Sequence, residues 1–175
     1  EIAPPDVGIL TYVSIVHGMN FSSVEEIAEA KCELFASKKL KVGFFHQSVT
    51  PFSAYQKLTC EKRPYYNEQE YLLETGNKSL PFRESHFCEN FLGAVSIARY
   101  FGLSIEEIER GAKKLKPFDH RFNEVVLSKV RYIDDSYNAS PVAVKAALNN
   151  LPVVQKGKKR IGVLGEMKDL GQFSE

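Results

Sequence analysis

The sequence predicts an α/β fold in which strands of a mostly parallel sheet are flanked by helices. Val7–Val16 is a nearly continuous apolar and β-branched run, the pattern of a strand buried on both faces. Segments with helical periodicity follow it, and several begin at a capping serine. Alternation of this kind is typical of parallel sheets covered by helices.

The first elements follow from apolar runs and caps. Val7–Val16 is expected to be a central strand. Ser23 and Glu26 have the spacing of a capping box and open an amphipathic helix of about three turns. Val42–His46 reads as a second strand, and residues 47–85 show no clear pattern.

Two further helices are expected in the middle of the chain. Apolar side chains recur at helical spacing over His86–Phe101, and this helix is expected to end at Gly102. Ser104 and Glu107 form another capping box, and Pro117 stops the helix that they open.

The last part of the chain predicts a hairpin, a helix and a strand. Glu124–Leu127 and Val130–Ile133 read as two short strands. Ser140, followed by a proline, caps the next helix, and Arg160–Leu164 reads as a strand. The polar segment Asp134–Ser140 is the best candidate for a domain boundary, because a new helix–strand pair starts after it.

Composition narrows the class of protein. The 175 residues carry a net charge of +1, with 43% hydrophobic and 26% charged residues, which excludes disorder and gives no broad basic surface for nucleic acid. No apolar run reaches the ~20 residues of a membrane span. The three cysteines are far apart, which predicts reduced thiols and a cytoplasmic location. Both ends of the chain look cut, so we expect a fragment.

Two polar residues near the first strand form one candidate site. His17 closes that strand, where ligands collect in parallel sheets. Lys31 lies along the apolar face of the following helix, where an ammonium is costly. Lys31 either extends its stem to the rim of the core or works at a phosphate or metal site beside His17. His17 is either a ligand or an ordinary hydrogen-bonded residue.

Two other clusters also interrupt the structural pattern. Asn90 lies one turn after His86 in an apolar stripe, so its amide either caps a neighbouring loop or meets a ligand. Arg121 and the run Asp134–Pro141 place two carboxylates and a helix N-terminus together, either as a capped turn or as a nucleotide edge. The chain has no phosphate-binding loop, so alone it should not hydrolyse nucleotides.

The order of these clusters resembles the ATP-dependent Mur ligases of peptidoglycan synthesis. Two strings are the specific ones: Asp134–Pro141, which reads DDSYNASP, and Leu164–Gly171, which reads LGEMKDLG. Within the family they are most like the ligases that add D-Ala-D-Ala to UDP-MurNAc-tripeptide. Folylpolyglutamate synthases share the architecture.

The resemblance implies an organisation and an activity. Residues 1–138 would be the C-terminal part of the central ATPase domain, and residues 139–175 the beginning of a Rossmann-like C-terminal domain. The full-length enzyme would use ATP and Mg²⁺ to join UDP-MurNAc-tripeptide and D-Ala-D-Ala through an acyl phosphate, as a cytoplasmic monomer. The alternatives are another Mur-type or folylpolyglutamate-type ligase, or a noncatalytic nucleotide-binding domain.

The resemblance also implies roles for individual residues. Lys31, carbamylated by CO₂, and His17 would hold a catalytic Mg²⁺, and oxygen ligands suit that ion. Asn90 would contact adenine, Arg121 phosphate and Asp135 the ribose. Tyr137 and Asn138 would lie at the hinge that closes the C-terminal domain over the nucleotide.

Overall fold

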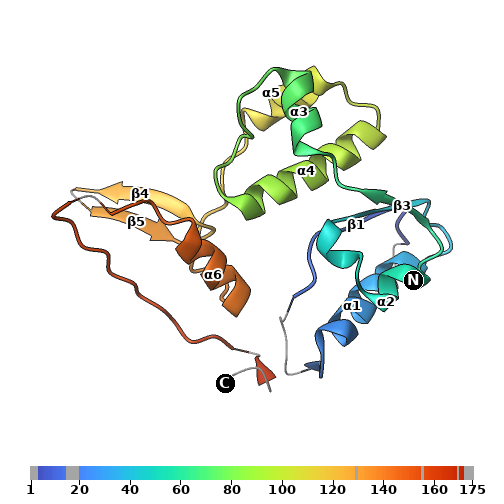
Figure 1. The fold of residues 1–175 in the computed structure, drawn as a ribbon, viewed down its shortest axis with the longest axis horizontal. Helices are drawn as coiled ribbons and strands as arrows, with labels where there is room; N and C mark the ends of the chain where they lie inside the picture. The colour runs from blue at the N-terminus through green and yellow to red at the C-terminus, as the bar shows by residue number, and fades with distance from the viewer. Residues whose placement is uncertain (1–3, 15–19, 129, 155, 169, 172–175) are drawn as a thin grey trace. The chain divides into compact units, whose positions relative to one another are not determined.

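The computed structural model describes residues 4–14, 20–128, 130–154, 156–168 and 170–171 (Figure 1). They form two compact units: the first comprises residues 4–14 and 21–115, and the second comprises Asn20 and the described residues from Lys116 onward. In chain order the first unit contains β1 (Val7–Leu10), α1 (Val24–Cys32), the 3-10 helix η2 (Glu33–Ala36), β2 (Val42–Phe45), the 3-10 helix η3 (Gln47–Val49), α2 (Ser53–Lys57), β3 (Glu61–Pro64), α3 (Glu68–Thr75), α4 (Ser85–Tyr100) and α5 (Ile105–Ala112). The second contains β4 (Asn123–Leu127), β5 (Val130–Asp134) and α6 (Pro141–Asn149).

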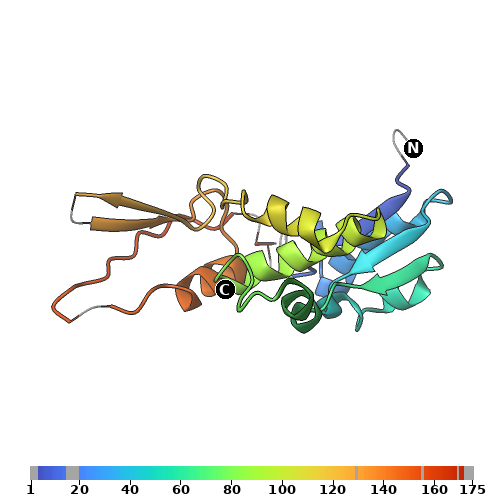
Figure 2. The ribbon, with the colours of Figure 1, turned by 90° about the horizontal axis from the view of Figure 1, so that it is seen from above.

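The first unit is built on a parallel sheet of three strands in the order β1-β2-β3. These strands lie side by side on the right of Figure 2. Val7 pairs with Val42, and Val42 pairs with Glu61. The α/β prediction is confirmed. The first strand, however, ends at Leu10, and β2 rather than β1 is central among the described strands. Residues 15 and 16 of the predicted strand lie outside the described residues.

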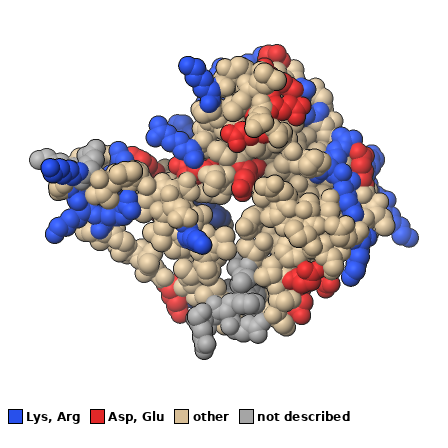
Figure 3. Space-filling model, in the orientation of Figure 1, with Lys and Arg blue, Asp and Glu red and all other residues tan. Residues whose placement is uncertain are grey.

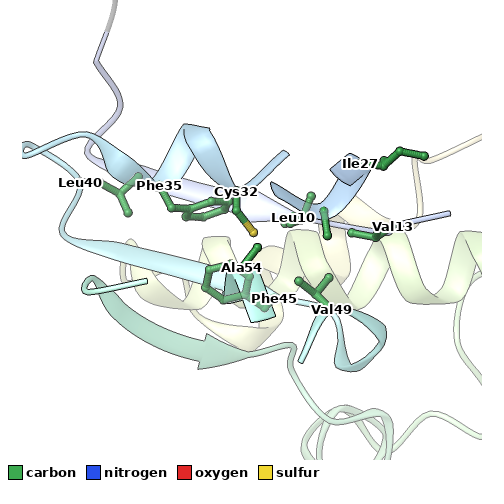
Figure 4. Packing of buried hydrophobic residues seen from close by; sticks show 10 residues of the cluster. Leu10, Val13, Ile27, Cys32, Phe35, Leu40, Phe45, Val49 and Ala54 are labelled. Atoms are coloured by element: carbon green, nitrogen blue, oxygen red, sulfur yellow. The ribbon is translucent and has the colours of Figure 1, made fainter. Parts of the chain in front are cut away.

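Alternating residues of the strands face two different helical layers. On one face, Leu10 and Phe45 pack with Cys32 of α1 and Val49 of η3, and Figure 4 shows these side chains pointing toward one another. On the other face, the Phe44 ring meets the Tyr100 ring of α4 at a centroid distance of 5.8 Å. None of the three cysteines forms a disulfide, and the Cys88 thiol donates a hydrogen bond to the carbonyl oxygen of Phe82.

Two glycines leave room for an aromatic ring above the sheet. A Cβ atom at Gly43 would lie 2.6 Å from Phe45 Cε2 and 2.8 Å from Phe35 Cε1, and one at Gly8 would lie 2.6 Å from Phe35 Cε1. All three distances are well inside van der Waals contact, so the Phe35 and Phe45 rings occupy the space that a side chain would take.

We expect Gly43→Ala to destabilise the protein, because Phe35 and Phe45 must leave their packed positions. The free energy of unfolding should fall by about 1–3 kcal/mol in chemical denaturation. Gly111→Ala is the matched control, since nothing lies within 4 Å of its Cβ position in α5, and it should be neutral or stabilising. Equal stability of the two variants would contradict the packing role of Gly43.

A second core joins the three helices that follow β3. Its buried residues are Tyr71, Leu80, Phe91, Val95, Ile108 and Ala112. The short helix α3 begins at the Asn67 cap and ends at Gly76, which has a left-handed φ of 69°. The predicted helices at 86–101 and after Ser104 are confirmed as α4 and α5, including the capping box of Ser104 and Glu107.

The second unit contains an antiparallel hairpin and one helix. Asn123 of β4 pairs with Asp134 of β5, and Ser140 caps α6 through the Ala143 amide, as predicted. The strand predicted at Arg160–Leu164 is wrong: this segment is irregular, with Ile161 86% and Val163 93% exposed. A strand needs a partner for its backbone groups, and the described residues provide none here.

Candidate functional site

The carboxyl edge of the parallel sheet holds Lys31 near the segment that follows β1. Lys31 comes from the last turn of α1, and its Nζ donates a hydrogen bond to the carbonyl oxygen of Tyr12 at 2.9 Å. The side chain is half-buried, and no carboxylate of the described residues lies within 4 Å of Nζ. His17 lies outside the described residues, so its pairing with Lys31 stays a prediction.

Burial lowers the pKa of Lys31 below the ordinary value of a lysine, because removal of water disfavours the charged ammonium. No carboxylate among the described neighbours offsets this effect. The fraction of neutral amine is therefore larger than on an exposed lysine, and a neutral amine is a nucleophile.

His46 lies at the same edge, directly after β2. Its Nδ1 accepts the backbone N–H of Ser48 at 3.2 Å and lies 2.8 Å from Ser48 Oγ. In the neutral ring the proton is therefore on Nε2, which is 3.9 Å from Glu89 Oε1 of α4. The buried imidazole lies between two tyrosine rings, with centroid distances of 6.0 Å to Tyr12 and 5.5 Å to Tyr65.

Tyr65 makes a hydrogen bond to the end of β1. Its hydroxyl donates to the carbonyl oxygen of Leu10 at 3.3 Å. Burial, together with the charge of Glu89, raises the pKa of Tyr65 above the ordinary value, so this phenol stays a hydrogen-bond donor at neutral pH.

His46, Tyr65 and Glu89 are functional-site residues that the sequence did not predict. The search for polar residues after buried strands would have found His46 if the second predicted strand had ended at Phe45. Tyr65 lies in the stretch without pattern, where β3 is recognisable only through its pairing with β2.

Asn90 lies on α4 one turn after His86, as predicted. Its side chain is exposed rather than buried in the apolar stripe, and its amide makes no hydrogen bond to the described residues. The interpretation of Asn90 as a cap for a neighbouring loop is therefore wrong. His86 is half-buried, with its ring 4.2 Å from the Phe87 ring. The Asn90 amide offers a donor and an acceptor to a ligand.

The second unit brings together candidate residues at the base of the β4–β5 hairpin, the segments 120–122 and 134–138 that flank its last strand pair. The Arg121 guanidinium lies 4.0 Å from the centroid of the Tyr137 ring, which is cation–π distance. Asp135 Oδ1 accepts the backbone N–H of Phe122 at 3.0 Å. Asn138 Oδ1 accepts the N–H of Ala139 at 2.9 Å. Three of these residues, Arg121, Tyr137 and Asn138, are exposed, so their polar groups are accessible to a ligand.

Asp134 stabilises the polar run after β5 through hydrogen bonds with Ser136 and His120. Hydrogen bonds from Ser136, and then from His120, lower the pKa of the Asp134 carboxyl below its ordinary value. Ser136 donates through its backbone N–H at 3.1 Å and through its hydroxyl at 2.7 Å. The polar run after β5 is thus held by its own side chains.

Charge on the viewed face of the molecule is of both signs. Figure 3 shows Lys and Arg side chains interspersed with Asp and Glu over the described part of this face. A site for polyanions would therefore depend on local cations such as Arg121.

Comparison with known proteins finds similarity to one family of ligases. Residues 120–175 match the family described as Mur ligase, glutamate ligase domain. The UDP-N-acetylmuramoyl-tripeptide–D-alanyl-D-alanine ligase of Bacillus subtilis is 27% identical over 196 residues, which include 100% of this chain and 42% of the relative. The ligase of the same name from Treponema pallidum is 30% identical over 193 residues, with 98% and 40% covered.

The chain is therefore similar to Mur ligases over nearly its whole length, at 27–30% identity. It spans about two fifths of the length of the curated relatives it matches. Among solved structures, MurF from Acinetobacter baumannii matches with a TM-score of 0.74 over 97% of this chain and 42% of that chain. At 22% identity this match shows a shared fold.

Lys31 and Asn90 belong to the first unit, on α1 and α4. Arg121, Asp135 and Tyr137 belong to the second unit. None of the described helices is long and apolar enough to cross a membrane.

Proposed function

We propose that this chain is part of a ligase that adds D-Ala-D-Ala to UDP-MurNAc-tripeptide at the expense of ATP. The observation that carries the proposal is that the chain matches ligases of this name over 98–100% of its own length. The Mur ligase fold of the structure supports it.

The proposed reaction makes an amide in two steps. The γ-phosphoryl group of ATP is transferred to the terminal carboxylate of the tripeptide, which gives ADP and an acyl phosphate. The amine of D-Ala-D-Ala then attacks the acyl carbon, the C–O bond to phosphate breaks, and the amine nitrogen loses its proton. Such transfers depend mainly on positioning and on neutralisation of phosphate charge.

Lys31 suits the role of a carbamate better than that of a cation beside Mg²⁺. Its Nζ donates only to a neutral carbonyl, and its pKa is lowered. Attack of the neutral Lys31 amine on CO₂ forms an N–C bond and releases a proton. The product is a carbamate, an anion with two oxygen ligands, in place of the positively charged ammonium. Lys31 as carbamate and His17 would hold Mg²⁺, which would neutralise phosphate charge when bound.

The other candidate residues would bind the nucleotide. The exposed Asn90 amide would contact adenine, whose ring nitrogen and amino group match an amide. Arg121 would pair with phosphate oxygens, and the free Asp135 oxygen would accept from the ribose. Tyr137 and Asn138 would form the hinge.

The organisation of the whole enzyme also stays a proposal. We place the boundary between the ATPase domain, 1–138, and the C-terminal domain, 139–175, within the polar run after β5. We expect a monomer, and we expect it in the cytoplasm, because its co-substrate ATP is found there.

The activity is tested with the full-length protein encoded by the native gene. We expect release of ADP and phosphate to require UDP-MurNAc-tripeptide and D-Ala-D-Ala together, and mass spectrometry should find the pentapeptide product. D-glutamate and L-alanine serve as matched amine controls. Turnover that responds to a single amino acid would support another Mur-type or folylpolyglutamate-type ligase. Absence of ATP turnover with every amine would favour a noncatalytic nucleotide-binding domain.

A further inference from the structure

We propose that His120 is a positioning residue that locks the base of the hairpin and thereby holds Arg121 over the Tyr137 ring. The inference rests on the proposed function only where it concerns ATP. Its structural part concerns described residues of the second unit alone.

Residues 120–122 and 134–137 are joined by a set of short contacts. The backbone N–H of Tyr137 donates to the carbonyl oxygen of His120 at 3.1 Å. The N–H of Phe122 donates to Asp135 Oδ1 at 3.0 Å. The two segments flank the pairing of Asn123 with Asp134, so these contacts extend the hairpin beyond its last strand pair.

The imidazole of His120 supplies a side-chain contact across this junction. Its Nδ1 lies 2.8 Å from Asp134 Oδ2 and 3.5 Å from Ser136 Oγ. The carboxylate is an acceptor, so Nδ1 carries the proton. Asp134 Oδ1 meanwhile accepts from Ser136. One carboxylate thus connects His120 to the segment that leads into Tyr137.

The backbone of His120 needs this contact. Its φ is +62°, in the left-handed region, and Phe122 has a φ of +50°. Residues other than glycine seldom adopt this conformation unless the surroundings impose it. A return of His120 to an extended conformation would redirect Arg121, which is the next residue, away from Tyr137.

The contacts of His120 affect ligand binding through the next residue, Arg121. The backbone N–H of Arg121 donates to the Phe118 carbonyl oxygen at 3.0 Å, and its guanidinium lies over the Tyr137 ring. An exposed arginine otherwise samples many rotamers, and fixing it before a phosphate binds reduces the entropy lost on binding. His120 would therefore increase affinity for ATP without touching it.

Two substitutions in the full-length enzyme separate the backbone from the side chain. His120→Gly removes the imidazole but accepts a positive φ freely. His120→Asn also tolerates a positive φ and keeps an N–H donor for Asp134. We expect His120→Gly to raise the KM for ATP about tenfold, with little change in kcat or in the KM for the UDP substrate. We expect His120→Asn to stay within about threefold of the natural enzyme.

A spectroscopic readout does not depend on activity. The Tyr137 ring should shift the NMR signals of the Arg121 side chain upfield, and this shift should be lost in His120→Gly and kept in His120→Asn. Retention of the shift and of the ATP KM in His120→Gly would overturn the proposal, as would equal impairment of both variants. If the natural enzyme shows no D-Ala-D-Ala-dependent turnover, the proposed function fails, while the NMR comparison still decides the role of His120.

Discussion

Lys31→Ala in the full-length enzyme is expected to lower kcat by about 100-fold or more, the cost of removing a group that stabilises transferred charge. The amine cannot be replaced by a neighbour, because no other lysine is hydrogen-bonded to the segment after β1 in the described part of the chain. Small carboxylic acids such as acetate should restore part of the rate, since they supply the anion that the carbamate would provide. Steady-state assays of ADP release, with and without acetate, measure both effects.

Lys38→Ala is the matched control for this prediction. Lys38 is exposed and lies beyond η2, so its removal should leave kcat within about twofold. A ¹³C-NMR carbamate signal from enzyme equilibrated with ¹³CO₂ should be present in the natural protein and absent in Lys31→Ala. Unchanged turnover in Lys31→Ala would instead identify Lys31 as a lysine whose stem packs on α1 while its ammonium reaches the rim.

Local signals in the sequence predicted the elements that have their own caps. The capping box of Ser104 and Glu107 and the Ser140–Pro141 start of α6 satisfy helix ends within one turn, so the residues themselves specify the boundary. In contrast, β3 reads Glu-Lys-Arg-Pro and has mostly exposed side chains. Its strand conformation comes from hydrogen bonds to β2, a long-range effect that periodicity does not report.

At Arg160–Leu164, in contrast, an apolar run predicted a strand that the structure does not contain. Apolar residues favour a strand only when another strand or a helix covers them, and Ile161 and Val163 are almost fully exposed. The same reasoning explains the shortened β1: its continuation past Leu10 has no ladder partner among the described residues, because β2 ends opposite it at Phe45.

The candidate site was predictable where a residue contradicted its surroundings. Lys31 stood out because a cation lay on an apolar face, and it is half-buried against the Tyr12 carbonyl oxygen. His46 did not stand out, since a histidine at the end of an apolar run looks like part of the strand. Its contact with Glu89 joins β2 to α4 across 43 positions of sequence, and only the fold brings the two together.

Asp135→Asn in the full-length enzyme is expected to raise the KM for ATP by about tenfold or more, because a charge-assisted hydrogen bond contributes about 1.5–3 kcal/mol. One oxygen of Asp135 accepts the Phe122 N–H, and the other makes no hydrogen bond to the described residues, which leaves it for a ribose hydroxyl. Asparagine has a single acceptor oxygen, so when that oxygen accepts from Phe122 the ribose hydroxyl meets an uncharged NH₂ group in place of a carboxylate oxygen.

The change should act on the nucleotide alone. We expect the KM for UDP-MurNAc-tripeptide to stay within about twofold, because the variant keeps the size of the side chain and the Phe122 contact. Asp119→Asn is the matched control: its carboxylate is exposed and makes no hydrogen bond or ion pair with the described residues, so it should change neither KM. Isothermal titration with ATP and with the UDP substrate measures the two affinities directly. Equal loss of both affinities, or a lowered Tm, would contradict the ribose role. It would mean that Asp135 acts through its hydrogen bond with Phe122 and supports the hairpin instead.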